Sequence, residues 1–194
     1  MKQLLIASNN FNKIREFKEI LANSPFKLLT CADLNAHLDI EETGMTFREN
    51  ALIKAKAFYD RFRIPTIADD SGLEVIALGN RPGVFSQRYS PSGTDEDNLA
   101  LLLKEMHGVE DRRAQYVCEL VYYQSPETVV FFSGILKGQI MDNPISGNGF
   151  GYDPVFYIPS LEKRLSQCRP EEKNAISHRG QAIRQLLDLL RSHS

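Results

Sequence analysis

The first 29 residues place short apolar segments on either side of an amphipathic helix, and this alternation constrains the fold more than any other feature. Residues 4–7 form one continuous apolar run and residues 26–29 indicate a second strand. Between them, Ile14, Phe17 and Leu21 are spaced for one face of a helix. The chain is therefore predicted to begin with a strand, a helix and a second strand.

Extended segments later in the chain make the predicted sheet mixed. Residues 66–68 are expected to form a buried strand that runs into an acidic turn at residues 69–72, and an extended apolar segment follows at residues 73–78. The β-branched and aromatic segments 114–123 and 128–136 are separated by a Ser-Pro pair, which predicts a long antiparallel hairpin.

Three more helices are predicted from caps and apolar spacing. Residues 46–49 match a capping box, so a helix is expected from there to about residue 61. Leucines and a methionine at residues 99–106 repeat at helical spacing. The last helix is expected to begin near Ser177, whose side chain can cap it.

Composition and charge exclude several classes of protein. At 194 residues, 42% hydrophobic and 25% charged, the chain is expected to be globular, either as one large domain or as two intimate lobes. The net charge of -2 provides no basic field, so we expect no nucleic-acid partner. No apolar run is long enough for a membrane span or a signal peptide, which predicts a cytoplasmic protein without membrane contact. Cys31, Cys118 and Cys168 are too far apart for a zinc site and are expected to be reduced packing residues.

Two acidic pairs are candidates for a metal site. Asp69 and Asp70 follow an apolar strand, where neighbouring carboxylates resist burial unless a cation or a donor network compensates them. Oxygen ligands of this kind suit Mg²⁺, which is usually held by one or two carboxylates together with substrate phosphates. Taken alone, the segment fits a solvated turn equally well. Glu41 and Glu42 add carboxylates to such a site, although an exposed loop also explains them.

Three other segments are candidates for substrate binding. Residues 8–13 lie between the first strand and helix, where backbone N–H groups and Lys13 favour an anion, although an Asn-rich helix cap also explains them. The glycines of residues 147–151 let the backbone approach a flat ligand, while core packing is the alternative for Phe150. A cationic cluster at residues 173–179 lies at a predicted helix start, where it opposes the helix dipole; either a bound polyanion or solvent exposure accounts for it.

Six segments of the chain, in this order, resemble one known family, that of inosine triphosphate pyrophosphatase and the XTP/dITP diphosphatases. The resemblance spans nearly the whole chain. It is carried by Ser8-Asn9-Asn10 through Lys13, Glu41-Glu42-Thr43-Gly44, Asp69-Asp70-Ser71-Gly72, Arg81-Pro82-Gly83, Phe150-Gly151-Tyr152-Asp153-Pro154 and Ser177-His178-Arg179-Gly180. One departure concerns phosphate-loop geometry, because many members have Thr-Gly-Asn where this chain has Ser8-Asn9-Asn10.

The resemblance implies a fold and an activity. The implied fold is α/β, with an elongated, two-lobed mixed β-sheet flanked by helices and a cleft between the lobes. Residues 1–194 would form a single domain of two intimate lobes. The activity is Mg²⁺-dependent hydrolysis of ITP, dITP and XTP to the nucleoside monophosphate and pyrophosphate, which cleanses the nucleotide pool. A homodimer is also implied. The alternatives are a Maf-like pyrophosphatase for modified nucleotides and a nucleotide-binding sensor without turnover.

By the same resemblance, each motif carries over a role. Asp70 is the implied general base and a metal ligand, with Glu42 and then Glu41 at the metal. The implied catalytic set is completed by Lys13, Asp69 and Lys54. The implied substrate-binding set is Ser8, Asn9, Asn10, Phe11, Asn12, Lys13, Ser71, Phe150, Gly151, Tyr152, Asp153, Lys173, His178 and Arg179.

Overall fold

The computed structural model describes residues 2–192, and the chain divides into two compact units. The first unit holds the described residues up to Asp70, residues 118–134 and the C-terminal segment from Arg179. The second unit holds residues 71–117 and 135–178. The expected cleft between two lobes stays a prediction.

The strands form a mixed sheet with the order β2-β1-β3-β5-β6-β7-β8, and β4 pairs with β3. β1 is parallel to β2 and β3, whereas β7 is antiparallel to β6 and β8. Three strands, β3, β5 and β6, contribute residues to both units. The strands are β1 (Lys2–Ile6), β2 (Phe26–Leu29), β3 (Thr66–Val75), β4 (Arg81–Pro82), β5 (Arg113–Ser125), β6 (Thr128–Ile140), β7 (Phe156–Ile158) and β8 (Lys163–Arg164).

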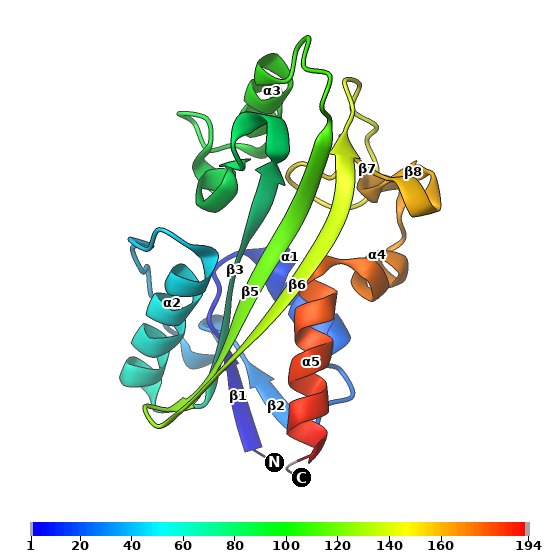
Figure 1. The fold of residues 1–194 in the computed structure, drawn as a ribbon. Coiled ribbons are helices and arrows are strands. Elements are labelled where there is room, and N and C mark those ends of the chain that lie inside the picture. Colours follow the sequence, from blue (N-terminus) through cyan, green and yellow to red (C-terminus); the bar gives the residue numbers. More distant parts are fainter. Residues whose placement is uncertain (1, 193–194) are drawn as a thin grey trace. The chain divides into compact units, whose positions relative to one another are not determined.

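The helices account for most of the remaining chain (Figure 1). The α-helices are α1 (Phe11–Ile20), α2 (Phe47–Phe62), α3 (Asp95–Glu105), α4 (Pro170–Ile176) and α5 (His178–Ser192). Short 3₁₀ helices cover Ala32–Leu34, Ile76–Leu78, Gly83–Arg88, Pro159–Leu161 and Leu165–Gln167. None of the helices in the described part of the chain is both long and apolar enough to cross a membrane.

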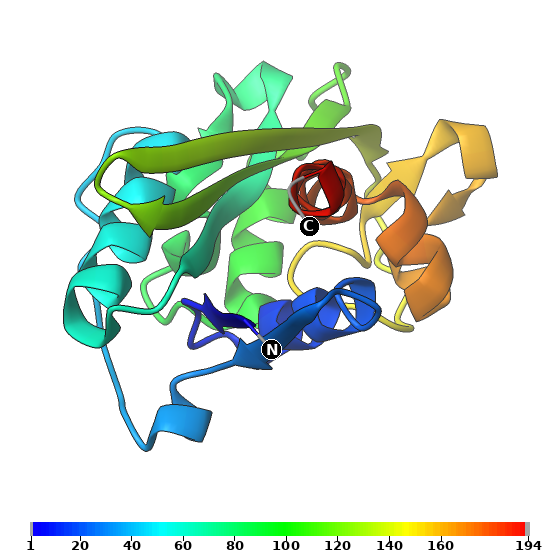
Figure 2. The ribbon, with the colours of Figure 1, turned by 90° about the horizontal axis from the view of Figure 1, so that it is seen from below.

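In the first unit, the two faces of the strands pack against different helices because successive strand residues point to opposite sides. Leu4 and Ile6 of β1 belong to a buried cluster with residues of α1 and α5. Leu5 and Ala7 belong to another cluster with residues of α2. Figure 2 shows α5 nearly end-on, with α1 nearby and α2 farther away at the edge of the view. The first unit is therefore a sheet covered by helices on both faces.

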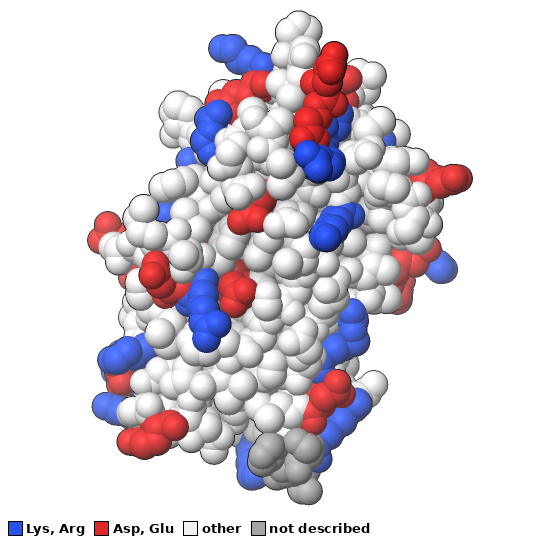
Figure 3. All heavy atoms as spheres, in the orientation of Figure 1, with Lys and Arg blue, Asp and Glu red and all other residues white. Residues whose placement is uncertain are grey.

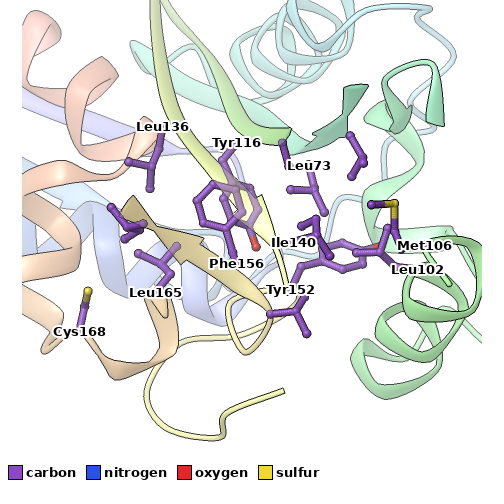
Figure 4. Packing of buried hydrophobic residues seen from close by; sticks show 14 residues of the cluster. Leu73, Leu102, Met106, Tyr116, Leu136, Ile140, Tyr152, Phe156, Leu165 and Cys168 are labelled. Atoms are coloured by element: carbon purple, nitrogen blue, oxygen red, sulfur yellow. The ribbon is translucent and has the colours of Figure 1, made fainter. Parts of the chain in front are cut away.

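The second unit has one core in which strand, helix and loop side chains meet. Leu73 of β3, Leu102 of α3, Tyr116 of β5 and Ile140 of β6 belong to it. Figure 4 shows Tyr116 next to Phe156 of β7, and Leu102 next to Met106 on the other side of the same core. This core fixes the loop that follows β6, because Tyr152 and Val155 are part of it.

Most predicted elements are confirmed, and the local chemistry explains why. Thr46 and Glu49 form the expected capping box at the start of α2, each side chain accepting a hydrogen bond from the other's backbone N–H. The predicted hairpin is present as β5 and β6. All three cysteines are buried and free, as predicted.

Three predictions about local structure are wrong. The extended segment expected at residues 73–78 ends at Val75. Ile76–Leu78 instead form a 3₁₀ helix, which Gly79 ends with a φ of +63° by donating its N–H to the carbonyl of Ile76. The expected acidic turn does not exist, because β3 runs without interruption from Thr66 to Val75 and carries both aspartates as strand residues. Lys173 does not lie at the start of the last helix. It lies instead in the last turn of α4, a separate helix that the sequence did not predict, where a cation is favourable toward the helix dipole.

Candidate active site

Five charged side chains of the first unit are buried, none more than 5% exposed. Lys13 and Glu16 lie one turn apart on α1, Asp69 and Asp70 are successive residues of β3, and Arg179 lies in the first turn of α5. We call these five residues the charged cluster. Charges this deep are stable only when they are paired or hold a ligand.

Asp69 is the most strongly compensated acid of the charged cluster. Its Oδ2 accepts from Nε of Arg179 at 3.1 Å and lies 3.3 Å from Nζ of Lys13. Arg179 also pairs with Glu16. Burial alone would raise the pKa of Asp69, but the Lys13 ammonium and the Arg179 guanidinium outweigh burial and hold that pKa well below its usual range. Asp69 is therefore a fixed negative charge and a weak base.

Asp69 has a second feature that points to a ligand. Its partners among the described residues are Lys13, Arg179 and, at 3.9 Å, the Cys118 thiol, and all three contact Oδ2. Oδ1 is buried and has no hydrogen-bond partner within residues 2–192. An ionised carboxylate oxygen in that position accepts from water or binds a cation.

Asp70 is in the opposite electrostatic situation, although it is the next residue. Its Oδ2 accepts from Nδ2 of Asn50 at 3.1 Å. Burial raises the pKa of Asp70; Lys13 opposes that shift, whereas the negative charge of Glu42 adds to it. Asp70 is therefore the more basic of the two carboxylates.

Glu42 and Lys54 form an ion pair in the first unit, with Nζ of Lys54 2.6 Å from Oε1 of Glu42. Burial by itself would lower the pKa of Lys54, but Glu42, Asp69 and Asp70 together raise it. Lys54 is thus a cation held by acids. Glu41 is exposed and has no ion pair with any described residue.

The segment before α1 has the geometry of a helix cap. Oδ1 of Asn10 accepts from the backbone N–H of Lys13 at 3.2 Å, and Oγ of the buried Ser8 accepts from the N–H of Asn10 at 3.1 Å. Asn9 donates to the carbonyl of Leu38 at 3.0 Å. Phe11 is 74% exposed and Asn12 is half-buried. The cap interpretation is confirmed, and the anion-binding role stays a prediction.

A second group of predicted residues gathers in the second unit around Asp153, which is 2% exposed. Its Oδ2 accepts from Nζ of Lys173 at 2.8 Å and from the backbone N–H of Phe150 at 3.0 Å. The Lys173 ammonium lies 4.4 Å from the centre of the Phe150 ring. Gly149 has a φ of +96°, and a Cβ there would lie 2.1 Å from Oδ2 of Asp153, so the loop needs glycine at this position.

His178 completes this group through an aromatic contact. Its imidazole is stacked on the ring of Tyr116, with centroids 4.8 Å apart and planes 7° from parallel. We call Tyr116, Phe150, Asp153, Lys173 and His178 the aromatic cluster.

Two other predicted substrate-binding residues lie outside both clusters. Tyr152 lies in the core of the second unit and donates to the carbonyl of Ser86 at 2.8 Å. Ser71 is half-buried in β3.

Comparison with known proteins identifies the family. The sequence profile of the Ham1 family matches residues 4–189. The chain belongs to the Ham1 family. A relative from Staphylococcus epidermidis named dITP/XTP pyrophosphatase is 44% identical over 191 residues, covering 98% of this chain and 97% of the relative. Another with the same name, from Halalkalibacterium halodurans, is 41% identical and covers 96% and 97%.

Solved Ham1 structures have the same fold. The Ham1 protein of Staphylococcus aureus superposes with a TM-score of 0.89 at 41% identity, covering 100% of both chains. A HAM1 protein from Coxiella burnetii gives a TM-score of 0.90 at 38% identity, covering 99% of this chain and 100% of the other. The predicted α/β fold with a mixed sheet and the predicted family are confirmed.

Three residues in or beside these clusters were not predicted from the sequence of this Ham1 chain. Glu16, Asn50 and Tyr116 each contact a predicted site residue. Glu16 and Asn50 are polar residues on the buried sides of α1 and α2. A polar residue among the apolar positions of a predicted helix is the sequence signal that could have identified them. Tyr116 has no such signal, because aromatic residues are ordinary in a strand.

Mg²⁺ was expected at the acidic residues, and the donor set fits that ion. Among residues 2–192, no group of three or more His, Cys, Asp or Glu residues is arranged to hold a metal. Mg²⁺ needs fewer protein ligands, because it keeps several waters and also binds substrate phosphates. Carboxylate oxygens are the ligands that this ion requires. They are supplied by Asp70 and by Glu42, whose negative charge raises the pKa of Asp70. Oδ1 of Asp69, which is buried without a hydrogen-bond partner among the described residues, is a third.

Proposed function

We propose that this chain hydrolyses dITP, XTP and ITP to the nucleoside monophosphate and pyrophosphate. Two full-length relatives bear the name dITP/XTP pyrophosphatase, which supports the enzyme class and the substrates. The observation that carries the chemistry is the opposite environment of Asp69 and Asp70. One acid is neutralised by two cations, and its neighbour is left basic.

In the proposed mechanism, Asp70 is the general base. It removes a proton from a water molecule, whose oxygen attacks the α-phosphorus, and the bond to the bridging oxygen breaks to release pyrophosphate. The proton is held on the Asp70 carboxylate, whose raised pKa suits it to this task better than Asp69. Asn50 fixes the carboxylate through its hydrogen bond to Oδ2.

The cations of the first unit neutralise the triphosphate. Lys13 and Lys54 are held in place by Asp69 and Glu42, so their charges are positioned before the substrate binds. Arg179 binds Glu16 and Asp69 at once and keeps the charged cluster rigid. Backbone N–H groups at the start of α1 add donors for phosphate oxygens.

We also propose that the activity depends on Mg²⁺. Asp70 and Glu42 would hold the ion, with Glu41 and Asp69 supporting them. When bound, the ion supplies Lewis-acid stabilisation of the negative charge on the triphosphate.

The aromatic cluster of the second unit is the proposed nucleobase site. Hypoxanthine and xanthine carry an oxygen acceptor at C6, where adenine carries an amino donor. The Lys173 ammonium and the His178 imidazole can donate to that oxygen, and the half-buried Phe150 ring offers a flat surface for the base. A buried donor left unpaired by adenine would discriminate by about 10⁴ or more. Such selectivity suits an enzyme that cleanses the nucleotide pool.

The remaining proposals concern partners and location. We propose a cytoplasmic homodimer that does not bind nucleic acid. On the face shown in Figure 3, acidic and basic side chains are interspersed, and no continuous basic stripe is seen. Light scattering after size-exclusion chromatography tests the dimer, and salt-dependent DNA retention tests the absence of nucleic-acid binding.

One experiment tests the proposed reaction. Pyrophosphate and orthophosphate are measured separately for dITP, XTP, ITP, dATP and dGTP, with Mg²⁺ and with excess chelator. We expect pyrophosphate only, from the first three substrates, and only with Mg²⁺. Turnover restricted to modified or methylated nucleotides would favour the Maf-like alternative, and tight dITP binding without product would favour a sensor.

A further inference from the structure

Tyr116 of β5 is a buried residue that no motif of the chain singled out. It is 7% exposed and lies in the core of the second unit, where its ring packs against Phe156 with centroids 4.7 Å apart (Figure 4). Its hydroxyl donates to Oδ1 of Asp153 at 3.1 Å. A core aromatic therefore contacts a residue of the proposed base site.

The Asp153 carboxylate has a donor on each oxygen. Tyr116 occupies Oδ1, while Lys173 and the backbone N–H of Phe150 occupy Oδ2. Rotation of the carboxylate would break these bonds together. By holding Oδ1, the Tyr116 hydroxyl fixes the orientation of the carboxylate. It thereby fixes the position of Oδ2, which accepts from Lys173 and from the loop that carries Phe150.

The ring of Tyr116 has a separate contact with His178. The two rings are parallel and within stacking distance, and His178 is only 5% exposed. Phe156 supports the Tyr116 ring from within the core. One side chain therefore orients both proposed donors to the base, Lys173 through Asp153 and His178 by direct stacking.

Burial raises the pKa of Tyr116, and the charge of Asp153 raises it further. The phenol is consequently protonated at neutral pH and acts as a hydrogen-bond donor. Phenylalanine at this position keeps the stacked ring and removes only the donor.

We propose that Tyr116 is a positioning residue for base selection: it holds Asp153 through its hydroxyl and His178 through its ring, and so sets the preference for a 6-oxopurine. This inference rests on the proposed function. Removing the hydroxyl frees Oδ1 of Asp153, and Lys173 then no longer has a fixed position toward the base. Adenine substrates, which gain nothing from that donor, lose less.

The test is Tyr116→Phe in the full chain. The kcat and KM for dITP and dATP are measured by pyrophosphate release, together with the midpoint of thermal unfolding. We expect the ratio of kcat/KM for dITP to that for dATP to fall about tenfold, the size expected for one hydrogen bond to a charged group, mainly through a higher KM for dITP.

The matched control is Tyr122→Phe, on the same strand. Tyr122 is similarly buried at 6% exposed, and its hydroxyl has no hydrogen-bond partner among the described residues. We expect this variant to keep the wild-type ratio within twofold. A Tyr116→Phe enzyme with a lower unfolding midpoint but an unchanged ratio would show a purely structural role and overturn the inference.

A double-mutant cycle tests whether Tyr116 acts through Asp153. Asp153→Asn should lower the substrate ratio by itself, and adding Tyr116→Phe should change it less than twofold further. Fully additive effects would contradict the proposed route. Wild-type protein that releases no pyrophosphate from dITP would refute the proposed function and this inference together, whereas active wild type with an unaffected Tyr116→Phe ratio refutes this inference alone.

Discussion

The charged cluster of the first unit and the aromatic cluster of the second are both buried, yet they are built in opposite ways. The charged cluster contains three acids and two cations, and each of its cations contacts an acid. The aromatic cluster has a single acid, Asp153, whose partners are one ammonium, one phenol and one backbone N–H. The first concentrates charge and the second orders rings around one carboxylate.

This difference indicates what each cluster can bind. A dense set of charges with one basic acid suits a polyanion and proton transfer. Stacked rings and a few fixed donors suit a flat, neutral base. Mutations in the first unit should therefore change kcat or stability, and mutations in the second should change KM and substrate choice.

The largest effect is expected for Asp70→Asn, which keeps the shape of the side chain and removes the base. We expect kcat for dITP to fall by about 10²–10⁴, the usual contribution of general base catalysis. The control is Asp60→Asn, at an exposed acid of α2, which should keep wild-type kcat. If the Asp70→Asn enzyme kept near-normal turnover in Mg²⁺, the assignment of catalysis to the charged cluster through Asp70 would be wrong.

The next effect is on stability. Arg179→Met leaves Asp69 and Glu16 buried without the guanidinium that both contact. Loss of one partner from a buried ion pair costs about 3–5 kcal/mol, so the urea midpoint should fall sharply. Arg184→Met, at an exposed position of the same helix, should leave the midpoint nearly unchanged. Equal midpoints for the two variants would mean that the charged cluster contributes little to folding.

A smaller effect is expected in the aromatic cluster. Lys173→Met removes the ammonium that lies over Phe150 and binds Asp153. A lost hydrogen bond to a charged group is worth about 1.5–3 kcal/mol, so KM for dITP should rise about tenfold or more while kcat changes less. Lys163→Met, which breaks the more exposed ion pair with Glu172, is the control. A fall in kcat at constant KM would contradict the assigned role.

The sequence predicted best what is determined locally. The capping box of α2 and the hairpin of β5 and β6 depend on residues close in sequence, and both are present. The prediction of an acidic turn was wrong because its signal was local: Asp, Ser and Gly at residues 69–72 are common turn residues. Burial of the Asp69 charge in β3 depends on Lys13 and Arg179, which lie far away in the sequence.

The site was predicted in a similarly uneven way. Motif residues such as Asp70 and Lys173 were found, but the contacts that give them different roles were not. The Arg179–Glu16 pair joins residues 163 positions apart, and the Tyr116–Asp153 bond joins residues 37 apart. Neither contact can be predicted from periodicity or composition. An aromatic residue in a strand or an acid on a helix has the same sequence pattern whether or not it contacts a site residue.

The smallest expected effect is that the enzyme loses activity at a higher pH than the pH at which it unfolds. Asp70 must be ionised both to act as a base and to hold Mg²⁺. Because its pKa is raised in the metal-free protein, kcat/KM at limiting Mg²⁺ should fall at a higher pH than an ordinary aspartate would give. Asp69 has a lowered pKa in the fold, so its stabilising contribution is complete above the unfolded value of about 3.9 and is lost only as the pH falls toward the lower folded value. On acidification, activity should therefore disappear while circular dichroism still reports the native fold, and it should return on neutralisation. Simultaneous loss of activity and structure would mean that Asp70 and Asp69 titrate together, and the electrostatic distinction between these neighbouring acids would be wrong.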